Sequence, residues 1–325
     1  MKRNLRIVFM GTPDFAVPSL DILVQHNYNV VGVITAPDKP AGRGQQLHQS
    51  AVKKYAVEKN LKVLQPEKLK NAEFIAELKS LEANLFIVVA FRMLPEIVWQ
   101  MPEYGTFNLH ASLLPQYRGA APINWAVING EKETGVTTFF LQHEIDTGNI
   151  ILQEKVKIED EDNAGTVHDK LMHLGAQLVL KTVQLIEINE VNETPQHTNY
   201  ELQPTTIKHA PKIFKETCLI DWNKSALEIH NLIRGLSPYP TAFTHLDGKV
   251  LKIFATQISQ WSTVNSQLKE TSTIDHRPST IDYKTDNKSF LSIKCADTYL
   301  DILELQLEGK KRMSIDEFLR GYKFN

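Results

Sequence analysis

Residues 6–10 read RIVFM, a short apolar run with neighbouring β-branched residues that stops at Gly11. Three similar runs follow, at 30–35 (VVGVIT), 85–90 (LFIVVA) and 136–141 (VTTFFL). None alternates cleanly between apolar and polar residues, which is typical of strands buried on both faces. Amphipathic helical patterns at 15–26 and 71–82 separate them. The sequence therefore predicts an α/β fold with a doubly wound, mostly parallel sheet of the Rossmann-like type.

The rest of the chain divides into a closing helix, a polar segment and a β-rich region. A helix is predicted from about Val167 to Ile188, begun by a Thr166-x-x-Asp169 capping box. Residues 190–207 are polar and aperiodic, which is a linker composition. We therefore predict a first domain at 1–189, a linker at 190–207 and a second domain at 208–325.

Short strands with turns between them are predicted throughout the second domain. The apolar runs are 241–246, 250–256, 290–294 and 300–307. Asp247-Gly248 is a typical hairpin turn between the first two. This pattern predicts a small antiparallel β-barrel resembling an OB fold, with Ser259–Ser289 as a long exposed excursion.

Composition excludes several classes of protein. The 325 residues are 42 % hydrophobic and 23 % charged, an ordinary mix for a globular protein. The longest apolar runs are about six residues, far short of the roughly 20 that span a bilayer, so we expect a cytoplasmic protein without membrane contact. Two cysteines, Cys218 and Cys295, are too few for a disulfide framework or a zinc cluster, and we expect both to be packing residues.

Charge is distributed unevenly along the chain. From residue 208 onward there are 17 Lys and Arg against 14 Asp and Glu, whereas residues 1–207 have 19 against 24. A polyanionic partner should therefore favour the C-terminal half.

The first strand ends in Met10-Gly11-Thr12-Pro13, where a dinucleotide-binding protein would show G-x-G-x-x-G. Only the first glycine is present, and Pro13 stands where the backbone would approach a pyrophosphate. The segment is better explained as a tight turn into a helix than as a nicotinamide or flavin site.

Asn108 and His110 are the first candidates for chemistry. In an extended segment alternate residues share a face, so the carboxamide and the imidazole should stand side by side. Together they offer two hydrogen-bond donors, one of which can transfer a proton, which suits an oxyanion and its leaving group. A buried polar pair that satisfies backbone groups would look the same, so the pair alone is not decisive.

Asp146 follows the strand at 136–141, and we expect it at the carboxyl end of that strand, close to His110. A carboxylate beside an imidazole fixes its tautomer and can accept a proton from an attacking amine. An Asx turn at Asp146-Thr147-Gly148 is the alternative. A metal site built from His110, His143 and Asp146 is disfavoured, because the sequence offers no H-x-x-x-H pair or second ligand cluster.

The chain as a whole resembles the folate-dependent formyltransferase superfamily, in the branch that acts on aminoacylated initiator tRNA. The motifs that carry the resemblance are 9–16 (FMGTPDFA), 37–44 (PDKPAGRG), 108–115 (NLHASLLP), 117–123 (YRGAAPI), 133–137 (ETGVT), 146–148 (DTG), 212–213 (KI), 220–222 (IDW) and 309–313 (GKKRM). The sequence departs from the family pattern at Val89–Pro95, which is one residue shorter and lacks a glycine.

The resemblance implies transfer of the formyl group of 10-formyltetrahydrofolate to the α-amino group of methionine on initiator tRNA, for translation initiation, without a metal. It also implies a monomer and a set of site residues: Asn108, His110 and Asp146 as the catalytic triad; Phe91, Ser112, Leu113, Leu114 and Pro115 at the folate; Arg43 and Lys212 at the tRNA.

Two alternatives remain open at this point. The chain could formylate another amine, such as an amino sugar nucleotide, or it could be a noncatalytic RNA-binding protein on the same scaffold. Retention of all three triad residues argues against the second alternative, because a binding module has no need of them.

Overall fold

The computed structural model describes residues 2–41, 46–196, 206–259 and 282–324. Contacts divide the chain into two compact units. The N-terminal unit comprises Met1–Gly119, Glu133–Lys157 and His168–His209, and the C-terminal unit comprises Ala120–Lys132, Ile158–Val167 and Ala210–Asn325. Arg43 and most of the predicted Ser259–Ser289 excursion lie outside the described residues.

A seven-stranded sheet forms the centre of the N-terminal unit, in the order β10-β9-β7-β6-β1-β2-β5. Its strands are β1 (Arg6–Gly11), β2 (Asn29–Ile34), β5 (Val63–Leu64), β6 (Leu85–Val89), β7 (Thr106–His110), β9 (Glu133–Phe140) and β10 (Ile150–Lys157). The five strands from β7 to β5 are parallel, whereas β9 is antiparallel to β7 and β10 is antiparallel to β9. The predicted mostly parallel α/β sheet is confirmed.

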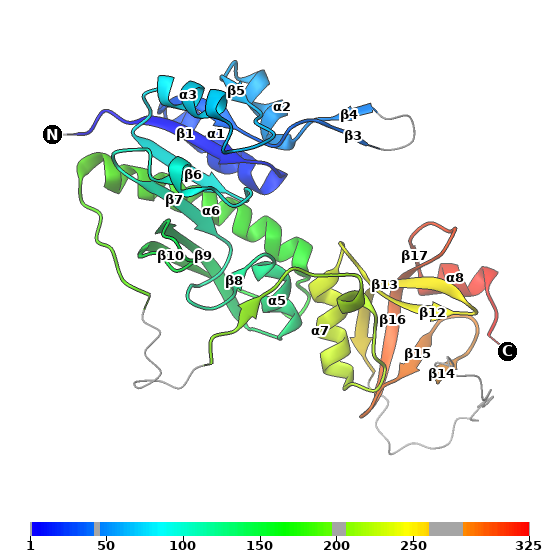
Figure 1. The fold of residues 1–325 in the computed structure, drawn as a ribbon. Coiled ribbons are helices and arrows are strands. Elements are labelled where there is room, and N and C mark those ends of the chain that lie inside the picture. Colours follow the sequence, from blue (N-terminus) through cyan, green and yellow to red (C-terminus); the bar gives the residue numbers. More distant parts are fainter. Residues whose placement is uncertain (1, 42–45, 197–205, 260–281, 325) are drawn as a thin grey trace. The chain divides into compact units, whose positions relative to one another are not determined.

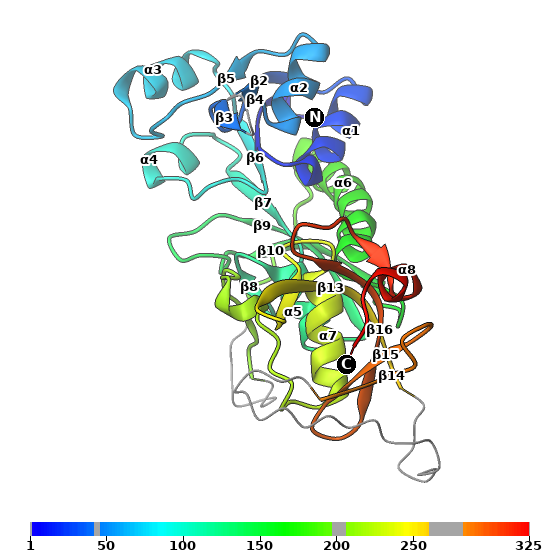
Figure 2. The same ribbon diagram turned by 90° about the vertical axis from the view of Figure 1, so that its right-hand side faces the viewer.

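Helices cover both faces of this sheet (Figures 1 and 2). They are η1 (Asp14–Ala16), α1 (Val17–Gln25), α2 (Ala51–Glu58), α3 (Ala72–Ser80), α4 (Glu96–Trp99) and α6 (Ala164–Ile188). In Figure 2, α3 and α4 lie on one face, and α1 and α6 lie on the other. Side chains of α3 and α4 share a buried core with alternate residues of β1 and β6, which explains why these strands read as continuous apolar runs.

Three short strands complete the N-terminal unit: β3 (Lys39–Ala41), β4 (Gln46–His48) and β8 (Arg118–Gly119). The antiparallel pair β3–β4 follows the carboxyl end of β2. Gly11 ends β1 in a turn too tight for a side chain, because an added Cβ would lie 2.7 Å from the Cβ of Ala16. This close contact explains why residue 11 is glycine, and a bound nucleotide is not needed to explain it.

Helix α6 begins three residues earlier than the sequence predicted, at Ala164. The side-chain oxygen of Asn163 accepts hydrogen bonds from the backbone N–H groups of Gly165 (2.8 Å) and Thr166 (3.0 Å). Asn163 is therefore the capping residue, in place of the predicted Thr166-x-x-Asp169 box.

The C-terminal unit contains the predicted antiparallel β structure. A six-stranded sheet is formed by β12 (Ala242–Leu246), β13 (Lys249–Ile258), β14 (Tyr283–Thr285), β15 (Leu291–Lys294), β16 (Tyr299–Leu307) and β17 (Met313–Ser314). The β12–β13 turn has positive φ at Asp247 (49°) and Gly248 (74°), which confirms the predicted hairpin. Four of these six strands, β12, β13, β15 and β16, contribute buried side chains to an apolar core that they share with helices that the sequence pattern missed.

Four helical elements and one short strand belong to this unit or to its boundary. They are α5 (Pro122–Ile128), η2 (Glu216–Cys218), α7 (Ala226–Leu236), α8 (Ile315–Gly321) and β11 (His209–Ala210). Capping boxes begin α7, at Ser225 and Glu228, and α8, at Ser314 and Glu317. Helix α5 joins this unit through α7, since Asn124 donates to the Gly235 carbonyl (2.8 Å). Among the described residues, no helix is long and apolar enough to cross a membrane.

Candidate active site

His110 is the last residue of β7 and lies at the carboxyl edge of the parallel strands. Its Nε2 lies 2.9 Å from the carbonyl oxygen of Tyr117. A carbonyl can only accept, so Nε2 carries a hydrogen and donates it to Tyr117. In the neutral ring the remaining lone pair is therefore on Nδ1. Tyr117 thus fixes the orientation of the imidazole and makes Nδ1 the nitrogen that can exchange a proton.

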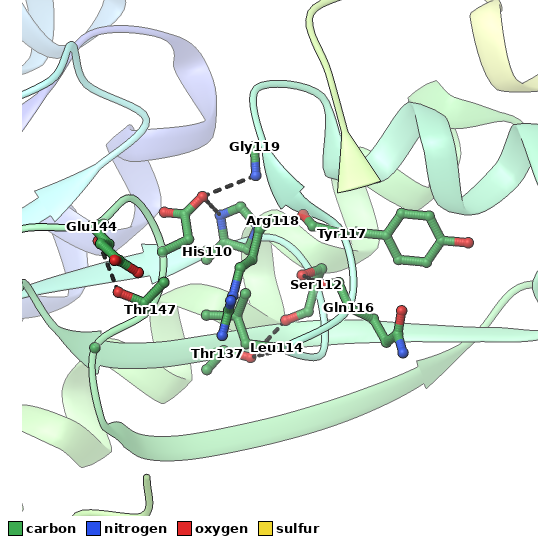
Figure 3. Close-up of polar contacts among 12 residues, drawn as sticks. His110, Ser112, Leu114, Gln116, Tyr117, Arg118, Gly119, Thr137, Glu144 and Thr147 are labelled. Atoms are coloured by element: carbon green, nitrogen blue, oxygen red, sulfur yellow. Dashed lines mark hydrogen bonds and ion pairs between the residues drawn. The ribbon is translucent and has the colours of Figure 1, made fainter. Parts of the chain in front are cut away.

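Asp146 faces that nitrogen. Its Oδ2 lies 3.9 Å from His110 Nδ1, and both side chains are largely buried, with 7 % of His110 and 12 % of Asp146 exposed. The separation is too long for a direct hydrogen bond but short for two groups of opposite charge. The same Oδ2 accepts a hydrogen bond from the backbone N–H of Gly119 at 2.9 Å (Figure 3). The carboxylate is therefore held by the backbone beside the imidazole.

The structure brings Asp146 to His110 by a route other than the predicted one. The prediction assumed that β9 ends at the same edge as β7. Because β9 is antiparallel to β7, its last residue, Phe140, pairs with Phe107 near the start of β7. The loop 141–149 returns past the sheet, so that Asp146 reaches His110 at the end of β7. The expectation that Asp146 sits at the carboxyl end of a parallel strand was wrong, although the two side chains do meet.

Asn108 occupies β7 two residues before His110. Leu109, between them, packs against α6, where a Cβ added to Gly175 would lie 2.7 Å from Leu109 Cδ2. Since side chains alternate along a strand, Asn108 and His110 point away from α6 and share a face. The Asn108 carboxamide is partly buried. Its donors are therefore placed on the same face of β7 as the imidazole.

The loop Ser112–Pro115 follows β7 and is stabilised by hydrogen bonds with Gln116 and Thr137 (Figure 3). Ser112 is fully buried, its hydroxyl donates to the Gln116 carbonyl (2.7 Å), and its carbonyl accepts from the hydroxyl of Thr137 (2.6 Å). Leu114 is also buried, whereas Leu113 and Pro115 are partly exposed. Of the four loop residues predicted to contact the folate, Leu113 and Pro115 are therefore the ones that can present surface to a ligand.

Phe91 lies just beyond β6, whose last residue, Val89, pairs with Leu109. Phe91 is therefore at the same edge of the sheet as His110. Ala90 before it has φ of 47°, a left-handed conformation that favours glycine. The guanidinium of Arg92 donates to the carbonyls of Glu67 (2.8 Å) and Pro66, which holds the loop in place.

Of the two residues predicted to contact tRNA, Lys212 lies within the described residues and Arg43 does not. In the same segment as Arg43, Asp38, at the base of the β3–β4 pair, accepts hydrogen bonds from Lys53 and Gln65. These bonds, from Lys53 first, hold the pKa of the Asp38 carboxyl below its usual value. Lys212 belongs to the C-terminal unit, and its Nζ lies 5.5 Å from the ring centroid of Phe214, which is 58 % exposed.

His143, which was considered with His110 and Asp146 as a disfavoured metal site, contacts other residues instead. Its Nε2 lies 3.3 Å from Glu96 Oε1, and its ring meets that of Trp99 edge-on at 5.6 Å. Within the described part of the chain, no group of three or more His, Cys, Asp or Glu side chains is arranged to hold a metal ion.

Sequence reasoning missed the groups that hold the pair in place. The Tyr117 carbonyl and the Gly119 N–H are backbone groups, so residue type carries no signal for them, although both lie within the quoted motif 117–123. Gln196 was counted as part of a linker. Its carboxamide donates to the carbonyls of Asp146 (3.0 Å) and Gly148 (2.8 Å).

Comparison with known proteins agrees with this geometry. Residues 5–183 match the family model described as formyl transferase, and residues 212–323 match the formyl transferase C-terminal domain. A sugar 3N-formyl transferase crystallised with dTDP and 5-N-formyl-THF has the same fold, with a TM-score of 0.64 at 22 % identity over 95 % of this chain and 100 % of that one. An N-formyltransferase from Helicobacter canadensis gives 0.63 at 20 % identity, with the same coverage. The fold and the two models define a formyltransferase.

Much more similar sequences identify the family within that class. A methionyl-tRNA formyltransferase of Bacteroides fragilis is 55 % identical over 99 % of this chain and 96 % of its own length. One from Phocaeicola vulgatus is 58 % identical over 99 % and 97 %. The chain belongs to the methionyl-tRNA formyltransferase family.

Proposed function

We propose that this protein transfers the formyl group of 10-formyltetrahydrofolate to the α-amino group of methionine on initiator tRNA, as a monomer in the cytoplasm, and that Asn108, His110 and Asp146 carry the chemistry. The observation that carries the proposal is the buried pair of His110 and Asp146, 3.9 Å apart, in a chain that matches both formyl transferase models. The alternative of an amino sugar nucleotide substrate is disfavoured by the full-length similarity to methionyl-tRNA formyltransferases.

The reaction begins when the neutral amine attacks the formyl carbon and the carbonyl oxygen becomes an oxyanion. The Asn108 carboxamide and the protonated His110 imidazole, which donates from Nδ1, stand on one face of β7 and stabilise this charge by hydrogen bonding. The amine loses a proton to Asp146, whose carboxylate is already oriented by the Gly119 N–H. The bond between the formyl carbon and N10 then breaks, and N10 takes up a proton delivered through His110 Nδ1.

The folate donor occupies the carboxyl edge of the parallel strands, between the loop that contains Phe91 and the loop Ser112–Pro115. Leu113 and Pro115 provide the exposed apolar surface there, and buried Ser112 and Leu114 keep the loop in shape. The donor is already activated and the nucleophile is a neutral amine, so the proposed reaction uses no metal.

The tRNA is bound by the C-terminal unit and by the segment that contains Arg43. Lys212 beside the exposed ring of Phe214 offers a cation for phosphate and an aromatic face for an unpaired base, which suits the single-stranded acceptor end. Arg43 adds a planar guanidinium that can hold phosphate or stack on a base.

A direct assay tests the proposal. The purified protein is mixed with 10-formyltetrahydrofolate and either methionyl-tRNA or an amino sugar nucleotide, and each amine is examined for the formyl group. Formylmethionyl-tRNA as the main product supports the proposal, and preferential formylation of the sugar nucleotide overturns it. Formylation of neither substrate, with tRNA still bound, would indicate a noncatalytic RNA-binding protein. The oligomeric state follows from light scattering of the same sample.

A further inference from the structure

The segment Glu193–Gln196 lies against the loop that contains Asp146. Ile150 and Thr194 exchange two backbone hydrogen bonds, each of 2.8 Å. Asn149 donates to the Glu193 carboxylate at 2.9 Å. These residues were predicted to be linker, but they form an antiparallel bridge to Ile150, the first residue of β10, and a side-chain hydrogen bond with Asn149 of the loop 141–149.

Gln196 makes the most specific of these contacts. Its Nε2 donates to the carbonyls of Asp146 (3.0 Å) and Gly148 (2.8 Å). Its Oε1 accepts from Nε (3.1 Å) and NH2 (2.6 Å) of Arg118. Carbonyls only accept and a guanidinium only donates, so these partners dictate which way the carboxamide faces. Both donors and both acceptor positions of the side chain are used.

Arg118 links Gln196 to the other half of the site. It stands between Tyr117, whose carbonyl accepts from His110, and Gly119, whose N–H donates to Asp146. Burial lowers the pKa of the Arg118 guanidinium, while the charge of Asp146 opposes that shift. One continuous network therefore runs from the imidazole through residues 117–119 and Gln196 to the backbone of Asp146.

The loop needs such support because its backbone is constrained. Asp146 has φ of 56°, in the left-handed region. At Gly148 a Cβ would lie 1.6 Å from the Phe140 carbonyl oxygen, so the loop closes directly against the end of β9. A left-handed residue without local support costs of order 1 kcal/mol and relaxes when its partners are lost.

We propose that Gln196 is a positioning residue for formyl transfer, which holds the Asp146 carboxylate beside His110 Nδ1 by fixing the carbonyls of Asp146 and Gly148. The inference rests on the proposed role of Asp146. Gln196 itself touches neither folate nor amine in this scheme. Its loss therefore lowers kcat and leaves substrate binding unchanged.

Two substitutions separate the donor from the acceptor function of the side chain. Gln196→Met removes both. Gln196→Glu keeps an acceptor for Arg118 but places a carboxylate against two carbonyls. We expect either change to lower kcat by about 10- to 100-fold, the range that a misplacement of about 1 Å produces, with the KM for methionyl-tRNA and the Kd for the folate within twofold of wild type. Gln306→Met is the matched control, because Gln306 also donates to a carbonyl, that of Lys310, in the C-terminal unit.

The decisive measurement repeats Gln196→Met in an Asp146→Asn background. If Gln196 acts through Asp146, the second substitution changes kcat by less than twofold there, and melting temperatures verify that each variant is folded. The inference is overturned by wild-type kcat in Gln196→Met, by near-normal kcat in Gln196→Glu, or by an undiminished effect in the Asp146→Asn background. If Asp146→Asn alone formylates at the wild-type rate, the proposed triad is wrong and the inference falls with it. If only the Gln196 variants are normal, the triad stands.

Discussion

Replacing Asp146 with asparagine removes a negative charge 3.9 Å from His110 Nδ1 and changes little else. Asparagine has the same shape, and its oxygen can still accept from the Gly119 N–H. The carboxylate lies 3.9 Å from Nδ1, and both side chains are nearly buried. At an effective dielectric constant of about 20, a unit charge at that distance stabilises an imidazolium by roughly 4 kcal/mol. At 1.36 kcal/mol for each factor of ten, that energy corresponds to a rate effect of about 10³.

We therefore expect Asp146→Asn to lower kcat by about 10²- to 10³-fold, because the amide dipole replaces part of the lost interaction and the lost proton acceptor adds to the deficit. The assay is single-turnover formylation of methionyl-tRNA at saturating folate, with folate affinity measured separately. Glu144→Gln is the control, since Glu144 is an exposed carboxylate on the same loop. A loss below fivefold in Asp146→Asn, or an equal loss in Glu144→Gln, would refute the electrostatic argument.

Three other predictions concern the tRNA, the thiols and pH. Lys212→Glu should raise the KM for methionyl-tRNA about tenfold at unchanged folate affinity. Arg43→Ala should lower kcat/KM toward methionyl-tRNA by an amount equivalent to about 1–3 kcal/mol, and Arg43→Lys should recover only part of that loss. Weakened folate binding would contradict both predictions. Burial raises the pKa of the Cys295 thiol to about 11, so iodoacetamide at pH 8 should label it only after denaturation, and rapid labelling of the native protein would show the assignment to be wrong. Burial and the nearby Arg234 lower the pKa of His230 below its ordinary 6.5, so the unfolded chain takes up this proton at a higher pH than the folded one. The free energy of unfolding should therefore fall as the pH drops below about 6.5. The variant His230→Gln should lose less stability than wild type between pH 7.5 and 5.5, as measured by thermal melts at both pH values.

Strands buried on both faces could be predicted from the sequence because their signal is local. The runs at 6–10 and 85–90 became β1 and β6, which are buried almost throughout. The Asp247-Gly248 hairpin followed from turn chemistry alone. By contrast, α7 and α8 were missed, although a Ser-x-x-Glu capping box begins each of them. Their capping signal was present in the sequence, but the prediction for that region rested on strand patterns.

The direction of β9 could not be predicted from its sequence. A run such as VTTFFL is equally apolar whether its neighbour is parallel or antiparallel, since both orientations bury the same side chains. The orientation depends on the path by which the chain returns from β7 to β9. The sequence therefore led to the correct pair, His110 and Asp146, through an assumption about strand direction that the structure contradicts.

Three residues with a left-handed backbone lie where the proposed chemistry takes place. Ala90, Tyr117 and Asp146 all have left-handed φ values, of 47°, 60° and 56°. None is glycine, and Ala90 has no polar side chain that could stabilise the conformation locally. Hydrogen bonds support each of them. Arg92, two residues after Ala90, donates to the Glu67 carbonyl, and His110 donates to the carbonyl of Tyr117. Asp146 accepts from Gln196 at its carbonyl and from the Gly119 N–H at its carboxylate. The tertiary contacts thus stabilise three unfavourable turns at one edge of the sheet, and the residues that supply them belong to the site as much as the imidazole and the carboxylate do.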